Sequence, residues 1–149
     1  MMLYRFIEIA VDHIRSSLWG KWAYSLFTGT AGTLLVFLFL NSFLPLDATL
    51  TWAPWVIGFN AMVTGYTLMD ATRRKIRRKR IAGIGSGVVV TLAAVFVLNL
   101  LSWQRWGQVF LGWTDFFFFT LVGAIFAGLG AALAIRYLQL NAPSSEKAA

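Results

Sequence analysis

The sequence predicts an all-α membrane protein in which four transmembrane helices follow an N-terminal amphipathic helix. Hydrophobic residues make up 58% of the 149 residues and charged residues 13%, whereas ordinary soluble domains have about 25% charged residues. Four apolar stretches approach the roughly 20 helical residues that cross a hydrocarbon core of about 30 Å. Lys and Arg also cluster in alternate connections, as expected when these connections stay in the cytoplasm.

The first 21 residues have the pattern of an amphipathic helix rather than of a span. Apolar residues recur at helical spacing along one face, and charged residues occupy the other face: Arg5, Glu8, Asp12 and Arg15. Such a helix binds in the plane of the membrane interface. We therefore expect residues 1–21 to lie along the cytoplasmic face and to lead into the first span.

The four spans are expected at 22–43, 52–69, 81–101 and 116–137. The second span is the shortest, and Pro54 would lie in its first turn, where a missing N–H costs nothing. Residues 138–149, with Pro143 and two neighbouring serines, are expected to form a disordered cytoplasmic tail.

The positions of the cations predict the orientation of the chain. Of the 13 Lys and Arg residues, only Arg105 falls in an expected outer connection. Cation-rich loops are retained in the cytoplasm, so we expect both termini inside (N-in/C-in) and a multi-pass protein of the bacterial inner (plasma) membrane. Tryptophans cluster in and beside the outer connections, where indole rings prefer the headgroup level.

The connection between the second and third spans is the most unusual segment. It carries seven cations within eight residues: Arg73, Arg74, Lys75, Arg77, Arg78, Lys79 and Arg80. Each cation near an anionic leaflet contributes about 1 kcal/mol. The loop is either a topology anchor or a binding segment for anionic lipids or an acidic partner. Nucleic acid is not expected as a partner, because the run has no aromatic platform or reading element.

Small residues four positions apart predict close helix contacts in the third and fourth spans. Such spacing lets helix backbones approach in lipid. The predicted packing residues are Gly83, Gly87, Gly123, Ala124, Ala127, Gly128 and Ala131. The fourth span has two such rows on adjoining faces, so we expect association with a second copy or with another membrane protein.

Asn60 and Thr64 are the polar residues of the second span that we consider as helix-packing or permeant-binding residues. No Asp, Glu, Lys, Arg or His occurs within the expected spans away from their ends, although proton relays and ion-coupled transporters normally place one there. The Asn60 amide needs partners, so it should face protein. It either joins two helices or, with Thr64, contacts a permeant species.

The composition argues against enzyme chemistry. The chain has no Cys and a single His, His13, so no metal site or cofactor is expected. The scattered candidates Asp70, Asp115 and His13 do not suggest a catalytic constellation. We expect a non-enzymatic accessory or scaffold subunit of an inner-membrane assembly; the alternative is a small homo-oligomeric channel or transporter with a pathway near Asn60.

A weak internal repeat has an offset of 58 residues. It aligns Gly29, Asn41 and Gly65 with Gly87, Asn99 and Gly123, among eight matches. If it reflects structure, two helical hairpins would be related by an axis along the membrane normal.

Overall fold

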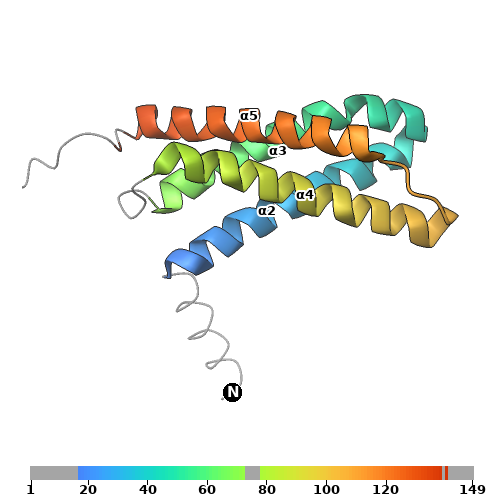
Figure 1. Cartoon of the computed structure of the whole chain (residues 1–149), viewed down its shortest axis with the longest axis horizontal. Coiled ribbons are helices and arrows are strands. Elements are labelled where there is room, and N and C mark those ends of the chain that lie inside the picture. The colour runs from blue at the N-terminus through green and yellow to red at the C-terminus, as the bar shows by residue number, and fades with distance from the viewer. Residues whose placement is uncertain (1–16, 73–77, 139, 141–149) are drawn as a thin grey trace, which may run out of the picture.

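The described part of the chain is all-α and contains four helices and no sheet. The structure is a computed structural model, and it describes residues 17–72, 78–138 and 140. The helices are α2 (Leu18–Phe43), α3 (Leu46–Thr72), α4 (Lys79–Trp106) and α5 (Trp113–Tyr137) (Figure 1). This confirms the predicted helical class. Most of the expected amphipathic segment 1–21 and of the tail 138–149 lies outside the described residues, but residues 18–21 belong to α2.

Local hydrogen bonds explain where three of the helices begin or end. The Ser17 hydroxyl accepts a hydrogen bond from the Gly20 N–H at 2.9 Å, which caps the start of α2. Gly107 has φ 67° and its N–H donates to the Trp103 carbonyl, so a left-handed glycine ends α4. Asp115 accepts from the Gly112 N–H at 3.0 Å, in agreement with its expected place at a helix N-terminus.

The second helix differs from its expected bounds. α3 begins at Leu46 rather than Trp52, and Pro54 therefore lies inside the helix instead of in its first turn. The expected start followed hydropathy, but helix formation depends on backbone hydrogen bonds. These already begin before the apolar stretch, because the Thr49 N–H donates to the Pro45 carbonyl.

α3 and α4 are the two central helices of the bundle, since each of them contacts the other three helices. The buried face of α3 shows this best. Its buried side chains recur at helical spacing along its whole length: Ala53, Ile57, Ala61, Thr64, Leu68, Met69 and Thr72. The described residues of α2 and α5 do not contact each other. The repeat relates the hairpin α2–α3 to the hairpin α4–α5. A two-fold axis between them would require an α2–α5 contact to match the contact between α3 and α4. The bundle therefore lacks the two-fold symmetry that the repeat suggested.

In α5, small residues predominate on the buried face and large apolar residues cover the outside. Buried positions of α5 include Gly123, Ala127, Gly130, Ala131 and Ala134, whereas Phe117, Leu121, Ile125 and Leu129 are exposed. A soluble domain does not leave such extended apolar surfaces uncovered. Close packing of small residues is the usual way in which helices associate in lipid.

Three of the four described helices are long and apolar enough to cross a membrane, namely α2, α4 from Lys79 to Gln104, and α5. α3 is 27 residues long but is not among these three. Three of its threonine hydroxyls donate to carbonyls of the same helix: Thr64 to Asn60 at 2.7 Å, Thr67 to Thr64 at 3.1 Å and Thr72 to Leu68 at 2.6 Å. These bonds reduce the cost of placing a hydroxyl away from water.

Candidate functional site

Cations from three helices gather at one end of the bundle, which we call the basic end: Lys21, Arg78, Lys79, Arg80 and Arg136. In Figure 1 this end lies at the left, where α3 ends and α4 begins. Two of its lysines bind backbone carbonyls. The Lys21 ammonium donates to the Ala71 carbonyl at 2.8 Å, and the Lys79 ammonium donates to the Leu140 carbonyl. Lys21 therefore ties α2 to the last turn of α3, where carbonyls favour a cation.

The remaining described cations of the predicted basic loop face outward. Arg78 and Arg80 are exposed, whereas Lys79 is partly buried. Arg73, Arg74, Lys75 and Arg77 lie outside the described residues. The positive charges of the two arginines are therefore accessible at the basic end, while Lys79 binds the chain beyond α5.

Asn60 and Thr64 lie in the contact between α2 and α3. The Asn60 amide nitrogen donates to the Val56 carbonyl at 3.0 Å. Its oxygen lies against Gly32, where a Cβ would approach to 2.7 Å. Thr64 is buried against Gly29, and the Ser25 hydroxyl donates to the Thr64 carbonyl at 3.2 Å. Both residues therefore take part in helix packing.

The predicted small residues lie mainly between α4 and α5. A Cβ on Gly87 would lie 2.2 Å from the Gly123 carbonyl oxygen, and one on Gly83 would lie 2.3 Å from the Ala131 Cβ. Ala127 meets both neighbours, because its Cβ is near Gly87 and its carbonyl is near Gly65 of α3. One row of α5 thus serves two helices of the same chain. In the second row, Ala124 and Gly128 are partly buried, and Gly128 borders Ile84.

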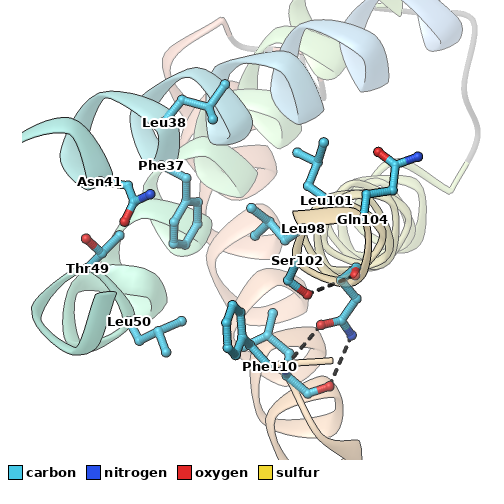
Figure 2. A pocket seen from close by; sticks show the side chains of 12 residues that line it. Phe37, Leu38, Asn41, Thr49, Leu50, Leu98, Leu101, Ser102, Gln104 and Phe110 are labelled. Atoms are coloured by element: carbon cyan, nitrogen blue, oxygen red, sulfur yellow. Dashed lines mark hydrogen bonds between the residues drawn. The ribbon is translucent and has the colours of Figure 1, made fainter. Parts of the chain in front are cut away.

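A cavity of about 330 Å³ lies at the opposite end of the bundle, between α2, α3, α4 and the connection that follows α4. Exposed tryptophans surround this end, which we call the tryptophan end: Trp52, Trp55, Trp103 and Trp113. Figure 2 shows Phe37, Leu50, Leu98 and Phe110 around the cavity, with Asn41 and Thr49 on one side and Ser102 and Gln104 on the other. Sequence reasoning did not identify this cavity, because its lining comes from four separate segments.

Asn99 holds the connection that closes the cavity. Its amide nitrogen donates to the Leu111 carbonyl at 3.1 Å, and its amide oxygen accepts from the Leu111 N–H at 3.0 Å. Ser102 adds a bond from its hydroxyl to the Gln108 carbonyl at 3.0 Å. These bonds satisfy backbone groups of a segment outside the helices. The only sequence signal was that Asn99 is an amide within an apolar run.

The described acidic residues do not converge on a catalytic site. Asp70 lies near the end of α3 at the basic end, and Asp115 lies in the first turn of α5 at the tryptophan end. The described residues also contain no group of three or more His, Cys, Asp or Glu side chains that could hold a metal ion. His13 lies outside them. Asp70 and Asp115 are too far apart to act as an acid and base on one substrate.

Comparison with protein families, curated proteins and solved structures gives no match for this chain. Its function is therefore argued from its own residues.

Proposed function

We propose that this chain is a four-span membrane protein, N-in/C-in, that serves as a non-enzymatic accessory or scaffold subunit of a bacterial inner-membrane assembly. α3 is the fourth span in this proposal. It is 27 residues long, or about 40 Å at 1.5 Å per residue. Its central position and its intrahelical hydroxyl bonds offset its lower hydropathy.

The observation that carries the proposal is the separation of charge between the two ends. Lys21, Arg78, Lys79, Arg80 and Arg136 lie at the basic end, whereas Arg105 is in the last turn of α4 at the tryptophan end. Cation-rich ends stay in the cytoplasm and tryptophans favour the headgroup level. The basic end therefore faces the cytoplasm, with Arg78 and Arg80 exposed to anionic lipids or to an acidic surface of another membrane protein.

The test is native mass spectrometry of the complex extracted gently from its own membranes into lipid nanodiscs. We expect a second protein at a fixed ratio with the native chain. The double variant Arg78→Ser/Arg80→Ser should lose this protein, because two exposed cations near an anionic surface contribute about 2 kcal/mol in total. Arg105→Ser is the matched control, since it removes a cation from the other end, and it should retain the partner.

Two results would contradict the proposal. A partner that stays bound to the double variant would exclude Arg78 and Arg80 as its binding residues. A pure homo-oligomer would instead favour the channel or transporter, for which flux assays on Asn60→Leu would follow.

A further inference from the structure

We propose that the cavity at the tryptophan end binds one acyl chain of a phospholipid from the outer leaflet of the membrane. This inference rests on the proposed membrane orientation and adds a ligand site to it. The cavity opens between α2, α3 and α4, and its volume of about 330 Å³ is at the lower end of the range for small-molecule sites, which is about 300–1,000 Å³.

The polarity that the lining offers to a ligand increases toward the helix ends. The amide of Asn99, which is beside Leu98, is already bound to the backbone of Leu111. Phe37 and Leu98 lie deeper in the bundle, whereas Asn41 and Gln104 lie nearer the helix ends. Along the helix axes, Asn41 is about 6 Å beyond Phe37, and Gln104 is about 9 Å beyond Leu98. A phospholipid has the same order along its length, with methylene groups below ester groups. Asn41 and Gln104 are both exposed, and their amides could donate hydrogen bonds to ester carbonyls.

The charge of the lining also favours the acyl and glycerol-ester part of a lipid over its charged headgroup. None of the residues that line the cavity is ionisable: Phe37, Leu38, Asn41, Thr49, Leu50, Leu98, Asn99, Leu101, Ser102, Gln104, Phe110 and Leu111. The headgroup would remain outside, at the level of the exposed Trp103. Apolar cavities hold water poorly but accept apolar ligands.

The closing segment is held in place independently of any ligand. Asn99 binds both backbone groups of Leu111, and Ser102 binds the Gln108 carbonyl. Phe110 and Leu111, which line the cavity, are thereby fixed next to it. A site whose wall is already ordered loses less conformational entropy when it binds a flexible chain.

The test uses the full chain in nanodiscs that contain a phosphatidylethanolamine with a diazirine on one acyl chain. The protein is extracted into mild detergent before photolysis, so that loosely bound lipids are diluted away, and labelled residues are mapped by mass spectrometry. In the native chain we expect labels on Phe37, Leu98, Leu101 and Phe110. In Leu50→Trp, where an indole fills the cavity, labelling should fall about tenfold, equivalent to 1.4 kcal/mol.

Two further variants separate occupancy from misfolding. Leu38→Trp changes an exposed residue at the edge of the cavity, so it should lower labelling without disturbing the core. Leu121→Trp, on the exposed face of α5, is the matched control and should label like the native chain.

Several results would overturn the proposal. One is a set of labels confined to the exposed faces of the helices. Another is equal labelling in all three variants. The third is a homodimer without lipid in which the second copy fills the cavity. Failure of the membrane placement itself would be distinct, because the chain would then not enter nanodiscs. Loss of the proposed protein partner would leave the labelling unchanged.

Discussion

At the scale of single residues, stability depends on where a Cβ can be accommodated. Gly87 and Gly85 lie two positions apart in α4, but their surroundings differ. A Cβ on Gly87 would lie 2.2 Å from the Gly123 carbonyl oxygen, which belongs to the backbone and cannot rotate away. A Cβ on Gly85 would meet nothing within 4 Å. The two positions therefore form a matched pair.

We predict that Gly87→Ala destabilises the protein by about 1–3 kcal/mol, the usual cost of overpacking, because α4 and α5 must move apart. Gly85→Ala should leave stability unchanged or raise it slightly, since alanine favours helix. Thermal unfolding of both variants in the same detergent measures the difference. Equal midpoints for the two variants would mean that α4 and α5 do not pack through Gly87.

Thr91 of α4 packs equally tightly against Gly123 of α5. Its hydroxyl oxygen is buried and has no hydrogen-bond partner among the described residues. It lies against Gly123, where a Cβ would approach it to 1.9 Å. The Thr91 side chain thus occupies the space that a Cβ at position 123 would need, and the Gly87 carbonyl oxygen would lie 3.1 Å from that Cβ, so a glycine suits this position.

At the scale of helices, the arrangement follows from which pairs touch. α2 and α5 each contact both α3 and α4. α2 is joined to α3 by apolar packing and by a few polar contacts, including the Ser25 hydroxyl to the Thr67 hydroxyl at 3.0 Å. Interhelical hydrogen bonds of this kind contribute about 0.6 kcal/mol each in membrane proteins. We infer that α2 is the least strongly held helix of the bundle.

Cysteine pairs can test this arrangement, because the chain has no cysteine of its own. A Cβ on Gly128 would lie 3.1 Å from the Ile84 Cγ1, which is one bond from the Ile84 Cβ. The two Cβ atoms are therefore close enough for a disulfide, in which they lie about 3.5–4.5 Å apart. We predict that Ile84→Cys/Gly128→Cys forms an intramolecular disulfide on mild oxidation, seen as a shift in electrophoretic mobility. Phe27→Cys/Gly128→Cys, which joins α2 to α5, should not. An intramolecular bond in this second pair would refute the helix arrangement.

At the scale of the whole molecule, the surface has the layers that a membrane imposes. Trp113 and Tyr137, the first and last residues of α5, are both exposed and lie about 36 Å apart along the helix. That distance slightly exceeds a hydrocarbon core of about 30 Å, so the proposed membrane placement puts both rings at the headgroup level. The exposed apolar side chains lie between them.

Labelling of single cysteines tests the proposed orientation. We predict that Gln108→Cys, in the exposed connection at the tryptophan end, reacts with a membrane-impermeant maleimide on intact cells. Ala149→Cys, at the end of the sequence, should react only after the cells are permeabilised. The reverse pattern would place the basic end outside and would contradict the positive-inside argument.

The sequence by itself determined the helical class, the apolar character of the chain and the places where cations collect. These properties follow from composition and from the length of apolar runs, which need no knowledge of neighbours. The tertiary structure decided the rest. α3 took a central place beside α4, and its start moved to Leu46, because backbone hydrogen bonding and packing outweigh hydropathy there. The cavity near Asn99 also emerged only in the fold, because its lining combines residues from Phe37 to Leu111, which no local pattern relates.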